Sequence, residues 1–390
     1  MNFIDNIELN PEIKLKKGEK YPFVEMANVS TNSRVPINIE QKTYSSGVKF
    51  EKNDTVIARI EPCIQNGKKF FCKDIEKGFG STEFLVFRPK NNSIDAKFLY
   101  YYLQTEFIRK TMIGSMTGAT GRQRVNNDIF NSLEINIPKK ETQEKIADIL
   151  SSYDDLIENN EKQIKLLEES AQRLYKEWFV DLHFPGYKCK EIIDGIPCDW
   201  ENKIVDDLGK IITGKTPSTT KPAYYGGNIP FVKIPDMHGN IYPFITESSL
   251  TKEGAETQKS KYLPKNSIMV SCIGTVGLVS IAVTECQTNQ QINSIILNNP
   301  KDLYYTYCLM KGIQSLLDNV GSNGATMTNV NKGKFANIKI LYPTEDIIDK
   351  FYNINKPIFD KIFYLSKQNN ALKEARDLLL PKLISGKIEV

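Results

Sequence analysis

Residues 118–138 read GATGRQRVNNDIFNSLEINIP, and residues 324–343 read GATMTNVNKGKFANIKILYP. Both segments carry Gly-Ala-Thr, then a phenylalanine, aliphatic residues and a proline, and their first residues are 206 positions apart. Further matches at a similar spacing join Phe23-Val24 to Phe231-Val232, Lys52-Asn53 to Lys265-Asn266, and residues 99–103 to residues 305–309. A repeat this long predicts two whole domains of one fold, not an array of small units.

Each copy of the repeat has the composition of a mostly-β domain. Short runs rich in β-branched residues, such as residues 55–60 and 267–273, are separated by Gly, Pro and Asn clusters that are typical of turns. We expect one short helix in each copy, over roughly 95–110 and 301–317, and a last short strand that ends at Pro138 or Pro343.

A long helix is predicted to follow each copy, because core positions recur in alternating steps of four and three. The first seam consists of Ile146, Leu150, Tyr153, Ile157, Asn160, Ile164, Leu167, Ala171, Leu174 and Trp178. The second consists of Ile358, Ile362, Leu365, Asn369, Leu372, Arg376, Leu379 and Leu383. Pro357 suits the first turn of a helix, so residues 345–355 are expected to form a separate turn or a kinked extension. Pro381 is expected to end or bend this helix.

The two seams match each other if the helices run antiparallel. In one register, whose paired residue numbers sum to 529, Asn160 faces Asn369, Ile157 faces Leu372, Ile164 faces Leu365, and Leu167 faces Ile362. Two asparagines that meet in an apolar seam satisfy each other and fix the register. The alternative is that each helix packs on its own domain or on a partner protein.

These patterns together predict an α+β fold: two similar, mostly-β domains separated by two long antiparallel coiled-coil helices with pseudo-twofold symmetry. The expected boundaries are a first domain at 1–140, a helical region at 141–182, a second domain at 183–343 and a C-terminal helical region at 344–390. A helix pair of ~33 residues is about 50 Å long. Two similar heads at a set spacing would suit a bipartite site on duplex DNA.

Charge is distributed unevenly along the chain. Residues 1–140 contain 22 Lys and Arg against 16 Asp and Glu, whereas residues 141–180 contain 5 against 10. Residues 181–343 contain 16 Lys and Arg against 14 Asp and Glu, so positive charge occurs in two blocks. DNA would be attracted to these two blocks and not to the acidic segment between them. The seven cysteines are scattered without metal-ligand spacing, which favours a reducing cytoplasm. We recognise no membrane-spanning run and no secretory signal.

Several motifs resemble type I restriction–modification specificity (S) subunits. The segment LLLPKLISGKI at 378–388 resembles the end of those proteins. Ile196-Pro197 with Trp200, then residues 214–218 (GKTPS) and 224–230 (YYGGNIP), resemble the opening of one of their target recognition domains. Residues 143–146 (QEKI) resemble the entry to their central helix, where the family often has Glu-Gln. The first domain lacks the opening motif and starts near Asn10-Pro11, so we expect it to be diverged or shortened.

The resemblance implies two target recognition domains that each read one half of an interrupted double-stranded DNA site. It also implies that the helical regions bind two modification (methyltransferase) subunits and that restriction subunits join the complex. This chain would then hold no cofactor, since S-adenosylmethionine, ATP and Mg would bind to the partner subunits. The expected role is sequence recognition in defence against foreign DNA, with no catalytic site in this chain.

Two other functions are compatible with parts of the sequence. Residues 209–216 (GKIITGKT) match the P-loop pattern of nucleotide-binding enzymes, but Pro217 follows at once, where a phosphate-binding helix would have to begin. We find no methyltransferase tetrapeptide and no convincing nuclease motif. The second alternative is a scaffold whose long helices bind proteins while its heads read no DNA.

DNA contacts are expected from basic and amide side chains on loops, because phosphate contacts position a protein and base-edge contacts give specificity. In the first domain the candidates are Arg122-Gln123-Arg124, followed by Arg59, Lys68 and Lys69. In the second domain they are Thr326, Asn329 and Lys332, with Lys215 and Lys221 elsewhere.

Overall fold

The computed structural model describes residues 1–31, 33–314, 316–317 and 329–390. The chain forms two compact units. The first unit consists of Met1–Asn159 with Ala371–Val390, and the second consists of Asn160–Asn370. The two long helices, α4 (Lys140–Tyr175) and α10 (Glu345–Ile384), each contribute residues to both units.

The first unit contains two four-stranded sheets. Its central sheet has the order β1-β8-β5-β6 and its outer sheet the order β3-β2-β7-β4. The strands are β1 (Ile7–Leu9), β2 (Lys20–Val24), β3 (Glu40–Thr43), β4 (Val48–Glu51), β5 (Thr55–Ala58), β6 (Lys69–Phe71), β7 (Lys77–Gly80) and β8 (Phe84–Pro89). All pairings are antiparallel except β2 with β7.

The second unit repeats the central-sheet topology and has a three-stranded outer sheet. Its central sheet has the order β12-β18-β15-β16, and β14-β13-β17 corresponds to the outer sheet, with β13 and β17 again parallel. The strands are β12 (Gly209–Thr213), β13 (Tyr225–Val232), β14 (Ser248–Leu250), β15 (Ile268–Ser271), β16 (Val279–Ile281), β17 (Gln287–Thr288) and β18 (Ile292–Leu297). The predicted duplication of one mostly-β domain is therefore confirmed, and the first copy is diverged in sequence without losing either sheet.

Shorter elements complete the two units. The helices are α1 (Phe3–Asn6), α2 (Ala96–Tyr102), α3 (Glu106–Gly114), α5 (Ile234–Met237), α6 (Lys252–Glu256), α7 (Leu303–Gly312) and α9 (Lys332–Ala336). The remaining strands are β9 (Ile192–Ile193), β10 (Ile196–Pro197), β11 (Glu201–Ile204) and β19 (Lys339–Tyr342). Single 3-10 turns occur at Met26–Asn28, Asn127–Asn131, Tyr187–Cys189, Val205–Leu208, Pro222–Tyr224, Lys259–Lys261 and Pro300–Asp302, and a π-helical turn at Lys176–Val180 follows α4.

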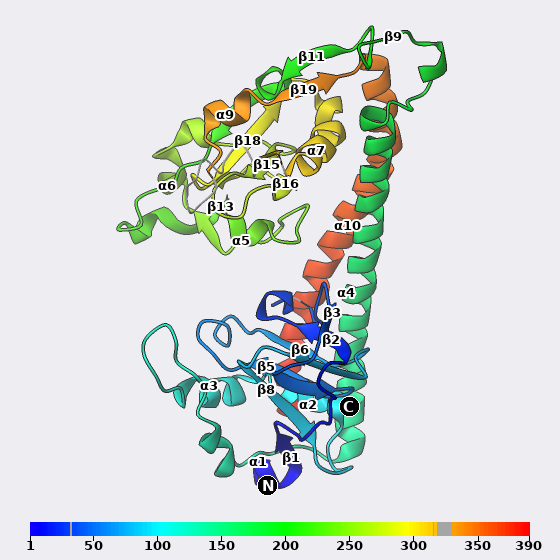
Figure 1. Cartoon of the computed structure of the whole chain (residues 1–390). Helices are drawn as coiled ribbons and strands as arrows, with labels where there is room; N and C mark the ends of the chain where they lie inside the picture. Colours follow the sequence, from blue (N-terminus) through cyan, green and yellow to red (C-terminus); the bar gives the residue numbers. More distant parts are fainter. Residues whose placement is uncertain (32, 315, 318–328) are drawn as a thin grey trace. The chain divides into compact units, whose positions relative to one another are not determined.

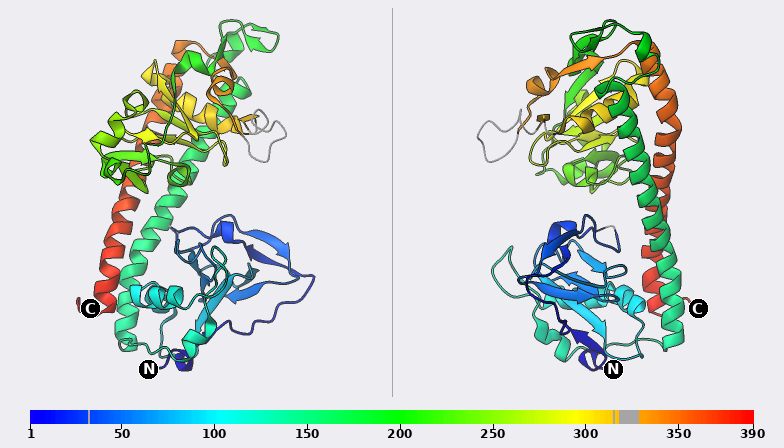
Figure 2. Two further views of the ribbon diagram at one scale, coloured as in Figure 1. Left: turned by 90° about the vertical axis from the view of Figure 1, so that its left-hand side faces the viewer. Right: turned by 45° about the vertical axis from the view of Figure 1, so that its right-hand side comes forward.

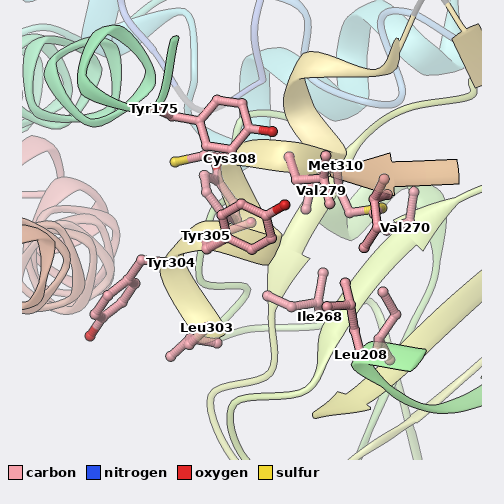
Figure 3. Close-up of a cluster of buried hydrophobic side chains, with 14 of the residues drawn as sticks. Tyr175, Leu208, Ile268, Val270, Val279, Leu303, Tyr304, Tyr305, Cys308 and Met310 are labelled. Carbon is pink, nitrogen blue, oxygen red and sulfur yellow. The ribbon is translucent and has the colours of Figure 1, made fainter. Parts of the chain in front are cut away.

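In each unit a short helix packs between the central sheet and the long helices. In the second unit this is α7, whose Tyr305 and Cys308 lie between Tyr175 of α4 and Ile268 and Val270 of β15 (Figure 3). In the first unit α2 has the same place and packs with Ile146 and Leu150 of α4 and with Leu380 and Leu383 of α10. These aromatic and aliphatic contacts belong to a large buried cluster in each unit, and such burial stabilises the fold.

The long helices lie side by side in each unit and run antiparallel (Figures 1 and 2). Asn160 Nδ2 donates to Asn369 Oδ1 at 2.8 Å and to Gln368 Oε1 at 3.0 Å, so the predicted asparagine contact is present. The other seam positions of the predicted register are buried (Ile157, Ile362, Leu365) or partly buried (Ile164, Leu167, Leu372). The heptad pattern therefore does bring these two helices together.

The expectation that α10 would begin near Pro357 and end or bend at Pro381 was wrong. The helix continues from Glu345 to Ile384 through both prolines. Each proline removes one main-chain hydrogen bond, from the carbonyl groups of Asn353 and Asp377. Both of these residues are exposed, so water is available to those carbonyl groups. Buried side chains on the opposite face keep the helix in register.

Two smaller expectations were wrong. The helix predicted over 95–110 is two helices, α2 and α3, separated at 103–105. The last strand predicted before Pro138 is reduced to an isolated bridge between Asn2 and Glu134, whereas β19 in the second unit pairs along its whole length with β11. Among the helices of the described residues, none has both the length and the apolar character to cross a membrane.

Candidate nucleic-acid interface

Three loops of the first unit meet at one end of its central sheet. They are the connection 59–68 after β5, residues 81–83 before β8 and the loop 115–124 after α3. Because β5 and β8 are antiparallel, the end of one strand lies beside the start of the other, and the Arg59 N–H donates to the Glu83 carbonyl at 2.9 Å. The third loop is joined to the first, because the Val125 N–H donates to the Arg59 carbonyl, also at 2.9 Å. We call this region the loop end of the first unit.

The second unit has an equivalent loop end. The Cys272 N–H donates to the Gln291 carbonyl at 2.8 Å, and the Val330 N–H donates to the Cys272 carbonyl at 2.9 Å. Isolated bridges occur at matching places, between Ile60 and Arg124 in one unit and between Ile273 and Asn329 in the other. Main-chain bonding thus makes Arg59, Glu83 and Arg124 the counterparts of Cys272, Gln291 and Asn329.

The side chains at the first loop end form a charged cluster. Arg124 Nε lies 3.0 and 2.9 Å from the two carboxylate oxygens of Glu83, and Arg124 Nη2 donates to Glu83 Oε1 at 2.6 Å. Arg59 Nε lies 3.7 Å from Glu83 Oε2. The hydrogen bonds from Arg124 lower the pKa of Glu83, so its carboxylate stays ionised at neutral pH.

The other first-unit candidates have different surroundings. Arg122 is exposed on the loop end and Gln123 is half-buried, with its carbonyl group accepting from the Glu61 N–H.

Lys68 Nζ donates to the Met26 carbonyl at 2.7 Å, away from the cluster. Lys69 lines a pocket of about 250 Å³ together with Arg109 and Arg376, and burial lowers its pKa to about 8. The structure therefore does not bring Lys68 and Lys69 together with Arg59 and Arg124, because their amines have other partners.

The second-unit candidates are spread over a wider area. Asn329 is exposed at the loop end, and Thr326 lies outside the described residues. Lys215 is exposed, and its N–H donates to the Thr288 carbonyl beside residues 289–291. Lys221 Nζ lies 5.2 Å from the centre of the Tyr224 ring and 3.2 Å from its hydroxyl oxygen.

Lys332 lines a groove along β12 with a volume of about 680 Å³. Lys210 and Lys261 also line this groove, and neither was predicted from the sequence. These three lysines are separated by 51 and 71 positions in the chain, so only the folded arrangement reveals their proximity. Glu83 and Gln291 were missed for the same reason.

The P-loop alternative is wrong in its local structure. Residues Gly209–Thr213 form the extended strand β12, which pairs along its length with β18. No helix begins in 214–221, the part that would have to open a phosphate-binding helix. An extended strand cannot curve its N–H groups around a phosphate. Within the described ranges, no group of three or more His, Cys, Asp or Glu residues is placed to hold a metal ion.

Comparison with known proteins gives matches to one family in both halves of the chain. The family described as "Type I restriction modification DNA specificity domain" matches residues 6–169 and 197–380. The type I restriction enzyme HindI specificity subunit of Haemophilus influenzae is 34% identical over 87% of this chain and 87% of its own length. The MjaIX specificity subunit of Methanocaldococcus jannaschii is 30% identical over 77% and 71%. A solved type I restriction-modification S subunit from M. genitalium has a TM-score of 0.54 at 16% identity, covering 98% of this chain and 95% of that one.

Proposed function

Because this chain belongs to the type I restriction–modification DNA specificity family, we propose that its two loop ends each bind one half of an interrupted duplex DNA site. The chain is a DNA sequence-specificity subunit, and its role is recognition without catalysis. Loops held by a sheet are suited to this role, since a rigid scaffold can carry variable side chains at its rim.

One observation supports separate readout by the two units. The main chain of both loop ends is bonded in the same way, but the side chains at equivalent places are charged in the first unit and neutral in the second. Base edges in the major groove differ in their donors and acceptors, so different side chains on one scaffold select different bases. This is the arrangement expected of a protein that reads two unlike half-sites.

The proposal includes partner subunits on the long helices. Leu156 and Leu378 in the first unit and Leu166 and Tyr364 in the second have exposed fractions of 48%, 58%, 64% and 66%. Apolar side chains form the buried core of protein interfaces, so these four residues are candidate contacts for partner proteins. We infer that two modification subunits bind there, that restriction subunits join the complex, and that these partners carry S-adenosylmethionine, ATP and Mg. The complex would act in the cytoplasm, in defence against foreign DNA.

A loop exchange tests whether the first unit reads its own half-site. Residues 115–124 are replaced by a glycine- and serine-rich loop of equal length, while the buried Val125 and Phe130 are kept. The variant is expressed with the modification subunit, and methylated sites are mapped across the genome. We expect one half of the recognised motif to become degenerate and the other to stay unchanged. Changes in both halves would contradict independent reading.

A scaffold function without DNA readout is favoured by the same exposed leucines, and it makes a different prediction. Reading of duplex DNA involves phosphate contacts, so affinity should fall steeply with salt, by about 0.9 logarithmic units per phosphate contact for each tenfold rise in salt. A scaffold would bind the modification subunit and show no salt-dependent affinity for duplex DNA. Titration of a labelled duplex at several salt concentrations distinguishes the two functions.

A further inference from the structure

Arg124 at the first loop end is held in one orientation by Glu83. Its Nε and Nη2 groups face the carboxylate, at 2.6 to 3.0 Å, which is the side-on arrangement of an arginine–carboxylate pair. The opposite edge of the guanidinium, formed by Nη1 and the second hydrogen of Nη2, is left for another partner. There Nη1 makes one long contact, 3.5 Å to the Arg122 carbonyl.

The position of Arg124 is fixed by the main chain as well as by Glu83. Its N–H and carbonyl both bond to Thr117, at 2.9 and 3.0 Å. The side chain of Arg124 is 42% exposed and that of Glu83 is 23% exposed, so the pair lies at the rim of the loop end. A guanidinium that is orientated before binding loses less conformational entropy when it meets a ligand.

The second unit has a neutral set at the same place. Asn329 replaces Arg124, Gln291 replaces Glu83, and Cys272 replaces Arg59. Asn329 is exposed. An end-on guanidinium fork fits the O6 and N7 acceptors of guanine, whereas an amide fits the N7 acceptor and N6 donor of adenine.

We propose that these equivalent positions read bases: Arg124, orientated by Glu83, binds a guanine in the half-site of the first unit, and Asn329 binds an adenine in the half-site of the second. Arg124 and Asn329 contact bases, and Glu83 is a positioning residue that acts through Arg124. The inference rests on the proposed function, that the loop ends bind DNA. It adds that the first half-site contains at least one G·C pair and the second at least one A·T pair.

The first experiment maps methylated sites in cells that express the modification subunit with this chain or a variant. Arg124→Ala should make one G·C pair of one half-site degenerate while the other half-site is still read, which also shows that the variant folds. In competition binding by the complex, we expect discrimination at that pair to fall about 5- to 150-fold. Asn329→Asp, which loses the amide donor, should affect one A·T pair of the other half-site.

Arg122→Ala is the matched control, because Arg122 has no carboxylate partner among the contacts described above. It should weaken binding to all sequences equally and leave the motif unchanged.

The role of Glu83 is tested by combining variants. Glu83→Gln should lower discrimination at the same G·C pair that Arg124→Ala affects. In the Arg124→Ala background, Glu83→Gln should have no further effect at this G·C pair, because the proposal has Glu83 act on that pair through Arg124. An equal additional loss in that background would show a general structural role for Glu83 and overturn its part in the proposal.

A third experiment needs no variant protein. Each guanine of the mapped motif is replaced in turn by 7-deazaguanine, which lacks the N7 acceptor, in a duplex bound by the wild-type complex. One replacement in the first half-site should weaken binding, and Arg124→Ala should abolish that sensitivity. The proposal is overturned if no guanine responds, if the first half-site contains only A·T pairs, or if Arg124→Ala leaves the motif unchanged. Failure of the proposed function gives a different result, since the wild-type chain would then direct no sequence-specific methylation at all.

Discussion

At the scale of single residues, Asp154 is a buried carboxylate in the first unit with two defined partners. Its side chain accepts from Arg376 Nη1 of α10 and from the Tyr101 hydroxyl of α2, both at 2.5 Å. A shift of 205 positions, which aligns the two helix seams, places Phe359 and Ala171 at the corresponding positions of the second unit, and both are fully buried. The same place between the helices is therefore polar in one unit and apolar in the other.

Breaking this ion pair should cost more than replacing it. Arg376→Met leaves the buried Asp154 carboxylate with the Tyr101 hydroxyl as its described hydrogen-bond partner, and loss of one partner of a buried pair typically costs about 3–5 kcal/mol. The double variant Asp154→Phe/Arg376→Ala copies the second unit and should be much closer to wild type. Urea unfolding midpoints of both variants test this expectation. A double variant as unstable as Arg376→Met would contradict it.

Lys69 is a partly buried cation of the first unit, near Arg376 and Arg109. Among the described residues its amine contacts the Gly67 carbonyl at 3.4 Å, and no ion pair with a carboxylate is present there. Burial lowers its pKa from 10.5 to about 8 in the folded chain. Between about pH 8 and pH 10.5 the unfolded chain therefore binds more protons than the folded one, so the contribution of Lys69 to stability rises with pH across that window. Below about pH 8 the full cost of burying the cation is present.

Lys69→Met should accordingly stabilise the protein most at neutral pH. We expect a gain of roughly 1–3 kcal/mol at pH 7, near the lower end because Lys69 keeps some exposure, and a smaller gain at pH 10. The measurement is the difference in urea midpoint between variant and wild type at both pH values. The same difference at pH 7 and pH 10 would show that the charge of Lys69 is not responsible.

The sequence predicts which basic residues lie on loops at the candidate site, but it does not predict their partners. Arg59, Arg124, Lys68 and Lys69 are alike in the sequence, as basic side chains on or beside loops. Their surroundings differ because the sheet brings Glu83 to the two arginines, while α10 and the Met26 carbonyl approach the two lysines. Such contacts join residues tens to hundreds of positions apart, and no local pattern encodes them.

At the scale of elements, the long helices were predictable because a heptad seam is a local pattern whose period depends only on helix geometry. The same reasoning failed at Pro357 and Pro381, where intrinsic preference predicts a helix end. The structure continues α10 because burial on its inner face outweighs two lost hydrogen bonds at exposed positions. The division of one expected helix into α2 and α3 is a boundary of the kind that periodicity does not resolve.

The asparagine pair between α4 and α10 should determine register more than stability. Asn369→Leu leaves Asn160 with Gln368 as its described side-chain partner, and we expect a loss of about 1–3 kcal/mol for the buried amide. Asn160→Leu/Asn369→Leu should be more stable than the single variant, because both polar groups are removed together. Unfolding midpoints measure the coupling. If the double variant loses the sum of the two single losses, the contact is not energetically important.

At the scale of the whole molecule, the duplication was visible in the sequence because matches recur in the same order over most of the chain. Both copies keep the strand order of the central sheet and the parallel pair of the outer sheet. We propose that α4 and α10 also determine the separation of the two half-sites. The proposal follows from their continuity, since each helix contributes to both units without a break.

An insertion tests this separation. Adding seven residues to α4 after Asn159 and seven to α10 after Asn370 preserves both heptad patterns and lengthens each helix by about 10 Å. At ~3.4 Å per base pair, the gap between the half-sites should widen by about three base pairs. Genome-wide mapping of methylated sites gives the new gap directly. An unchanged gap would show that the helices do not measure the distance.

The central claim, that this chain directs modification to a two-part DNA site, is tested most directly by methylome sequencing. Cells that carry the modification subunit are compared with and without this chain. The account predicts methylation only when the chain is present, at one motif made of two specific halves separated by a fixed number of unspecified bases. Methylation that does not depend on the chain, or that falls on a single uninterrupted motif, would contradict it.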